Sequence, residues 1–176
     1  MEIHDPIHRA TYAFSREGDT LRVETWLDDG GHLPEHFHPT LDETWQVLEG
    51  QVRLKLDGVW CDIVPPHGAQ PVPRNTRHEL KNVSGRRAHL VATATPPGRL
   101  EEFLTESARA AQEGLYNARN LPTSWRGAIW VAKFAQRHRD ETVMCSPPPA
   151  LQRLVLPLVA RLTGRSARRR SLAAPR

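Results

Sequence analysis

Cysteine is scarce in this sequence: Cys61 and Cys145 are the only two among 176 residues, and they form no Cys-x-x-Cys pair. We expect both thiols to be free, and the chain is long enough to bury a core without disulfides. The opening MEIHDPIHRA lacks the basic and apolar regions of a secretory leader, which favours a reducing, cytoplasmic location. No run of eighteen apolar residues occurs, so no transmembrane segment is expected.

Several signatures of common chemistries are also missing. The chain has no Ser/His/Asp arrangement, phosphate-binding loop or dinucleotide fingerprint.

The net charge of +4 does not describe the main body, because residues 161–176 hold six arginines and no acid, and the remainder carries a net charge of −2. This tail has no interleaved aromatic residues, so we expect it to be disordered and expect no nucleic-acid partner. Arginine outnumbers lysine by 21 to 3, as in GC-rich bacterial genomes.

What the sequence does contain, over residues 10–95, is a series of short strand-like segments separated by turn signals. The pair Asp57-Gly58 is a strong hairpin signal between two of them. Many short strands at close spacing favour a mainly β sandwich or barrel over an α/β fold. The expected strands are ATYAF, LRVETWL, TWQVLEG, VRLKL, VWCDIV and AHLVATAT.

After Pro97 the apolar residues recur at helical spacing. We predict helices over 98–114, over 123–138 with Thr123 or Ser124 as the cap, and over 146–164. Their apolar surface is too large to stay exposed, so they should cover the barrel or pair two barrels as a homodimer. The expected organisation is a β-barrel at 1–97, a C-terminal helical extension at 98–164 and a basic tail at 165–176.

The stretch HFHPTLDETWQVLEG, residues 36–50, concentrates metal-ligating side chains. His36 and His38 are two residues apart, so in an extended segment both imidazoles leave the same face. Asp42 and Glu43 follow after a short corner. Two imidazoles and a carboxylate directed into one space favour a bound cation.

Which carboxylate faces the interior depends on strand register. Glu43 shares strand parity with Trp45 and Val47, which favours Glu43. A slip of one residue would exchange it for Asp42, so both remain candidates at this point.

Two segments carry a family resemblance. Residues 30–50 spell G-x5-H-x-H-x4-E-x6-G, which resembles the first cupin motif, and residues 73–82 resemble the second, P-x-G-x2-H-x3-N. Asn75 replaces the glycine of the second motif, and the glycine that opens it is displaced by one residue, to Gly68. Asparagine tolerates positive φ, so the first departure is chemically mild.

The resemblance covers about residues 10–95 and implies a double-stranded β-helix, the jelly-roll cupin barrel, with the site in one mouth. It also implies one divalent transition metal (Fe, Mn, Ni or Zn) held by three histidines and one glutamate. The residue types and their spacing indicate three of these four ligands without the family resemblance. The implied ligands are His36, His38, Glu43 and His78.

Such a site predicts a metal-dependent protein that binds a small molecule. Oxygenase-type chemistry is the first expectation, with Glu43 either a ligand or a catalytic base. The alternatives are an isomerase, cyclase or lyase acting on a carbonyl compound, and a cupin that only binds its ligand. Trp45, Val47 and His89 are the candidate pocket residues. The remaining histidines (His4, His8, His32, His67 and His138) are expected to be solvent-exposed or packing residues.

Overall fold

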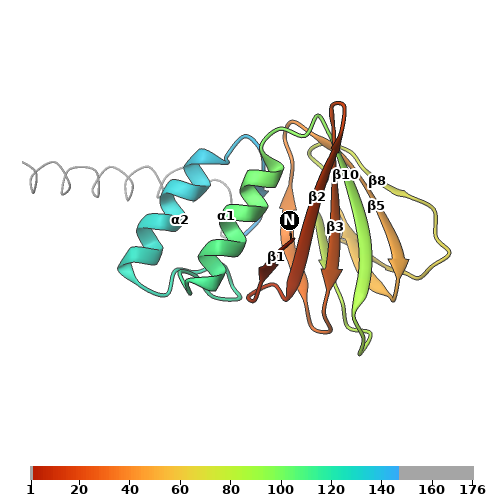
Figure 1. Cartoon of the computed structure of the whole chain (residues 1–176), viewed down its shortest axis with the longest axis horizontal. Helices are drawn as coiled ribbons and strands as arrows, with labels where there is room; N and C mark the ends of the chain where they lie inside the picture. Colours follow the sequence, from red (N-terminus) through yellow and green to blue (C-terminus); the bar gives the residue numbers. More distant parts are fainter. Residues whose placement is uncertain (1, 147–176) are drawn as a thin grey trace, which may run out of the picture.

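A computed structural model of the chain describes residues 2–146, which form two antiparallel sheets followed by two helices (Figure 1). The six-stranded sheet has the order β1-β2-β3-β10-β5-β8, and the five-stranded sheet has the order β11-β4-β9-β6-β7. This is the mainly β jelly-roll architecture that the sequence predicts. The strands are β1 (Glu2–Asp5), β2 (Ala10–Glu17), β3 (Thr20–Leu27), β4 (His32–Phe37), β5 (Asp42–Glu49), β6 (Val52–Leu56), β7 (Val59–Ile63), β8 (Gln70–Val72), β9 (His78–Lys81), β10 (Ala88–Thr95) and β11 (Val143–Met144).

The core lies between the two sheets because the strands alternate buried and less buried residues. Strand β3 alternates strictly along its eight residues, and its Leu21 and Leu27 are fully buried. Leu90 of β10 and Leu54 of β6 bring the opposite layers into the same cluster. This period of two is what directs one face of each strand to the core and the other to solvent. All six predicted strands are present.

The turn residues adopt the backbone angles that the sequence predicts. Asp57 and Gly58 have φ values of 44° and 90°, the pair of positive angles that a type I′ turn requires between β6 and β7. Asn75 also has a positive φ, of 66°. Its backbone N–H donates to the carbonyl of His38, 2.8 Å away. The loop before β9 is thereby tied to the end of β4.

Two helices follow the last long strand: α1 (Leu100–Gln112) and α2 (Trp125–Arg137). Both lie beside the β1 end of the six-stranded sheet (Figure 1). Ser124 caps α2, accepting a hydrogen bond from the backbone N–H of Gly127 at 3.1 Å. Gly127 weakens helix propensity, but a Cβ at this position would collide with the carbonyl oxygen of Leu115. Close packing therefore explains the glycine.

The chain then returns to the barrel. Strand β11 pairs with β4, placing Val143 opposite Phe37 and Met144 opposite His36. The segment that follows the helices is thus part of the five-stranded sheet. The third predicted helix, residues 146–164, and the basic tail lie almost wholly outside the described residues. Within residues 2–146, no helix is both long and apolar enough to cross a membrane.

A buried carboxylate closes the turn between β1 and β2. Asp5 is 1% exposed and accepts hydrogen bonds from the backbone N–H groups of Ile7 (2.9 Å) and His8 (3.0 Å) and from the His8 ring (2.8 Å). Burial alone would raise the pKa of Asp5, but these hydrogen bonds hold it below its ordinary value of 3.8.

Substituting Asp5→Asn is therefore expected to lower the free energy of unfolding at neutral pH by about 1–3 kcal/mol. A carboxyl with a depressed pKa stabilises the fold above its unfolded pKa and loses that contribution as pH falls through the folded pKa. The gap between parent and variant should consequently shrink below pH 3.8. Urea unfolding at neutral and acid pH measures it. Equal stability at neutral pH would show that the carboxylate contributes nothing to the turn.

Candidate metal centre

Three imidazoles from two separate segments converge at one mouth of the barrel. Strand β4 carries His36, the chain just beyond it carries His38, and β9 begins at His78, which pairs directly with His36. One ring nitrogen from each lies within 4.8 Å of the other two. The ring centroids are 4.1 to 5.2 Å apart. The two-residue spacing does place His36 and His38 on one side, as the sequence predicts.

Glu43, on β5, completes the cluster from the opposite sheet. Its Oε2 lies 3.5 Å from Nε2 of His38 and 3.3 Å from Nε2 of His78, and its side chain is 4% exposed. Asp42 points the other way and pairs with Arg74 at the surface, 2.7 Å away. The register alternative is therefore settled geometrically, with Glu43 inside.

The hydrogen bonds of the three rings fix which nitrogen faces the centre. Nδ1 of His36 lies 2.6 Å from the carbonyl of Pro34, and Nδ1 of His78 lies 3.0 Å from that of Thr76. A carbonyl oxygen can only accept, so each Nδ1 carries the proton and donates it. Each Nε2 is left with a lone pair, the form in which histidine ligates a metal.

The third ring is held by the C-terminal part of the chain. Nδ1 of His38 donates to the backbone carbonyl of Glu141 at 2.8 Å and lies 3.2 Å from the hydroxyl of Thr142. The Nε2 atoms of His38 and His78 are buried and have no hydrogen-bond partner within the described part of the chain. Orphaned, inward-facing lone pairs are what a metal ion satisfies.

The electrostatics suit a cation. Burial, reinforced by the rings of His78 and His38, holds the pKa of His36 well below its ordinary value, so this ring is neutral. Burial would raise the pKa of Glu43, but His38 and His78 outweigh it and hold that pKa well below the usual range. The pKa of His38 is raised, since Glu43 outweighs the effect of its burial. Three imidazole nitrogens and one carboxylate suit a divalent first-row ion.

Trp45 orients the carboxylate. Its indole N–H donates to Oε2 of Glu43 at 3.0 Å, and both side chains are buried. Groups that hold a ligand in place typically change metal affinity by 10- to 100-fold when removed.

We therefore expect Trp45→Phe, which keeps the aromatic ring but removes the N–H, to weaken metal affinity by about tenfold or more. Competition with a chromophoric chelator measures the change. Trp26→Phe is the matched control, since Trp26 stacks on His89 at 4.7 Å and has no contact with the cluster. Equal losses in the two variants would deny Trp45 this role.

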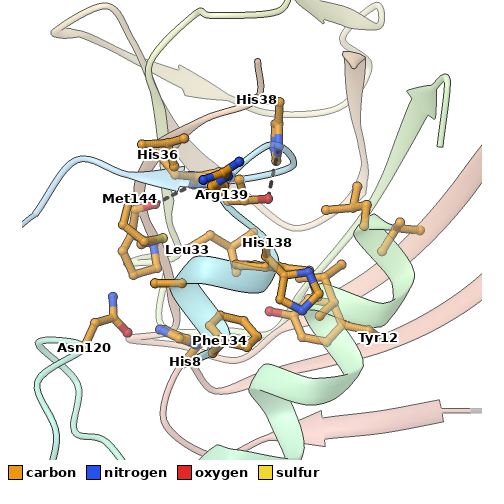
Figure 2. A pocket seen from close by; sticks show the side chains of 18 of the residues that line it. His8, Tyr12, Leu33, His36, His38, Asn120, Phe134, His138, Arg139 and Met144 are labelled. Carbon is orange, nitrogen blue, oxygen red and sulfur yellow. Dashed lines mark hydrogen bonds between the residues drawn. The ribbon is translucent and has the colours of Figure 1, made fainter. Parts of the chain in front are cut away.

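A cavity of about 550 Å³ adjoins the cluster, and His36, His38 and Glu43 form part of its wall. Figure 2 shows His36 and His38 at this end of the cavity. Helices α1 and α2 contribute aromatic residues to it, among them Phe103, Trp130 and Phe134. The helical extension thus helps to enclose the mouth of the barrel. A mostly apolar cavity with a few convergent polar groups is the usual form of a small-molecule site.

Of the three pocket residues expected from sequence, only Trp45 lies on this wall. Val47 has the same strand parity but lies further along β5, in the hydrophobic core. His89 faces outward on β10, stacking on Trp26 and pairing with Glu24 at 3.1 Å. Conversely, His8 and His138 are buried and line the cavity, although no sequence pattern separates them from the other histidines.

Comparisons with known proteins agree with this architecture. Residues 23–94 match the family model described as Cupin domain. The structure of KdgF from a Halomonas species is 18% identical, covers 57% of this chain and 93% of its own, and has a TM-score of 0.52. An RmlC-like cupin from Shewanella frigidimarina is 22% identical, with coverages of 57% and 87% and a TM-score of 0.50.

Two further similarities are more partial. The structure of AerE from Microcystis aeruginosa is 16% identical, with coverages of 56% and 46% and a TM-score of 0.51. A protein named polyketide synthase CurC, from Streptomyces cyaneus, is 31% identical over 67 residues, which is 38% of this chain. The match spans 43% of that relative, less than half its length.

Proposed function

Residues 23–94 match the Cupin domain and the chain has the cupin fold, and from this premise we propose that it binds one divalent transition-metal ion and acts on a small organic molecule in the adjoining cavity. The single observation that supports this most is the set of three Nδ1 hydrogen bonds, which leaves the Nε2 atoms of three converging rings free to bind an ion, two of them next to the Glu43 carboxylate. The proposed ligands are His36, His38, Glu43 and His78.

We favour oxygenase-type chemistry. A bound redox-capable ion such as iron, manganese or nickel would supply Lewis acidity and one-electron exchange to a chelating substrate and dioxygen. The protein's own contribution is orientation and exclusion of water. Glu43 is buried and lines the cavity, so its carboxylate is placed to accept a substrate proton. The apolar walls contributed by α1 and α2 keep the reacting group dry.

The second candidate is a metal-dependent isomerase, cyclase or lyase acting on a carbonyl compound. The partial similarity to a protein named polyketide synthase favours it, because polyketides carry ketone oxygens able to chelate a divalent ion. Here Lewis acidity alone would suffice, and Glu43 would move a proton next to the carbonyl.

One experiment separates these functions from simple ligand binding. The protein is loaded in parallel with Fe(II), Mn(II), Ni(II) or Zn(II) and given catechol, flavonol and 1,3-diketone probes, with and without oxygen. An oxygenase consumes oxygen with a redox-capable ion and not with zinc. An isomerase, cyclase or lyase gives product with zinc and without oxygen. Binding without turnover under every condition would leave only the non-catalytic alternative.

A further inference from the structure

A second group of polar side chains, around His8, lies in the same cavity, away from the metal centre. His8 lines the cavity and is 7% exposed. Figure 2 shows it at the opposite end from His36 and His38, with Leu33 between them and Phe134 beside it. Its backbone carbonyl accepts a hydrogen bond from the N–H of His32, at the start of β4. Four residues of strand separate His32 from His36, a span of about 13 Å.

The ring of His8 is oriented by a buried carboxylate. Its Nδ1 lies 2.8 Å from Oδ2 of Asp5, and the hydroxyl of Tyr116 donates to the same oxygen at 3.3 Å. Asp5 is held ionised by these contacts, so it accepts, and Nδ1 must be the donor. In the neutral ring Nε2 is then the acceptor.

That acceptor has no partner within residues 2–146, although it is buried. A buried polar atom without a hydrogen bond lowers the stability of the folded protein. The rings nearest to it do not offer a donor: His32 meets the imidazole edge-on at 5.4 Å, and Tyr116 directs its hydroxyl at Asp5 and Ser107. A donor supplied by a molecule in the cavity would satisfy it.

The wall between the two polar ends is apolar and aromatic. Trp130 stacks between Tyr116 and Phe134, with centroid distances of 5.7 and 4.5 Å and interplanar angles of 10° and 21°. Within residues 2–146, the cavity wall has three fully charged residues: Glu43 of the metal centre, and Arg139 and Asp140, which pair with each other at 3.4 Å. In this described part of the wall, the one arginine already has a carboxylate partner, so no unpaired side-chain cation is placed to receive a phosphate or carboxylate.

We propose that the cavity takes an elongated, uncharged aromatic molecule with oxygen atoms at both ends, and that His8 is its second anchor. One end carries the chelating oxygens, which rests on the proposed metal function. The other carries a hydroxyl that donates to Nε2 of His8. Flat aromatic rings pack against the stacked wall between the ends. Phosphorylated and other anionic substrates are disfavoured, because they would bury charge without a partner.

The test pairs a hydroxyl deletion in the probe with a nitrogen deletion in the protein. The probes are biphenyl-3,4,4′-triol and biphenyl-3,4-diol, together with the corresponding stilbene pair as a longer version. The catechol end suits the metal, and the 4′-hydroxyl is the group under test. His8→Asn keeps an N–H donor for Asp5 but removes Nε2. His32→Asn is the matched control, since that ring touches His8 and lies outside the cavity wall.

The binding of each probe to the zinc-loaded full-length protein is measured by isothermal titration calorimetry. For the biphenyl or the stilbene, whichever length fits the cavity, we expect His8→Asn to weaken binding of the 4′-hydroxy probe by about tenfold. The 4′-deoxy probe should bind parent and variant alike, and His32→Asn should affect neither probe. A merely structural role for His8 would weaken both probes equally. That result, no effect on either, or no binding of any probe would overturn the proposal.

The metal centre is tested separately with the same protein samples. Zinc content is measured for each protein, and the probes are titrated again after chelator treatment. Loss of zinc dependence with the hydroxyl–His8 coupling intact would reject the metal centre and retain the anchor. Retained zinc binding without that coupling would reject the His8 anchor and retain the metal centre.

Discussion

Replacing His78 with alanine is expected to abolish stoichiometric metal binding while leaving the barrel folded. His78 provides one of three Nε2 atoms, and its ring lies between His36 and Glu43, with a centroid 4.1 Å from that of His36. Without it, two imidazoles and a carboxylate remain, and the metal loses a neutral ligand on the side of β9. We expect an affinity loss larger than the 10- to 100-fold typical for residues that only support a ligand.

The measurement is elemental analysis after dialysis against a weak chelator. His89→Ala is the matched control, because His89 is also a barrel-strand histidine but faces outward against Trp26. Circular dichroism of both variants checks that the fold survives the cavity left by a fully buried ring. Equal metal content in the His78 variant and the control would remove His78 from the centre.

The second large effect is expected from the carboxylate. In Glu43→Gln the side chain keeps its shape and one carbonyl oxygen but loses its negative charge. Glu43 is the only carboxylate in contact with the three-histidine cluster among residues 2–146. Its loss leaves a divalent ion buried among neutral ligands, so we expect affinity to fall by at least about 100-fold.

Asp42→Asn is the control for this change, because it makes the same chemical substitution one residue earlier. Asp42 is paired with Arg74 at the surface and should leave metal affinity unchanged. Chelator competition at fixed pH measures both variants. An effect of Asp42→Asn as large as that of Glu43→Gln would mean that the carboxylates had been assigned in the wrong register.

Much of this centre could be predicted from local pattern alone. His36 and His38 share a face because strand residues alternate, and Glu43 faces inward with Trp45 for the same reason. The positive φ of Asn75 follows from what asparagine tolerates in a turn. Such features depend on neighbours only a few residues away.

The remaining features depend on contacts between distant segments. Val47 has the correct parity, but only the tertiary structure decides how far along β5 the cavity extends. His89 faces outward because β10 pairs with β3 and places it opposite Trp26. The role of His8 as a hydrogen-bond acceptor depends on its contacts with Asp5 and Tyr116. Tyr116 lies 108 positions after His8 in the chain. Likewise, nothing in the sequence near Glu141 indicates that its carbonyl holds His38.

We propose that three imidazole nitrogens and the Glu43 carboxylate together hold one ion. The most direct test is elemental analysis of full-length protein purified without added metal, followed by X-ray absorption spectroscopy of the bound ion. We predict about one first-row divalent ion per chain, with a shell of nitrogen and oxygen only and the outer scattering of several imidazoles. A protein that retains no ion even after loading with iron, manganese, nickel or zinc, or an ion bound by sulfur, would show that these four residues do not form a metal centre.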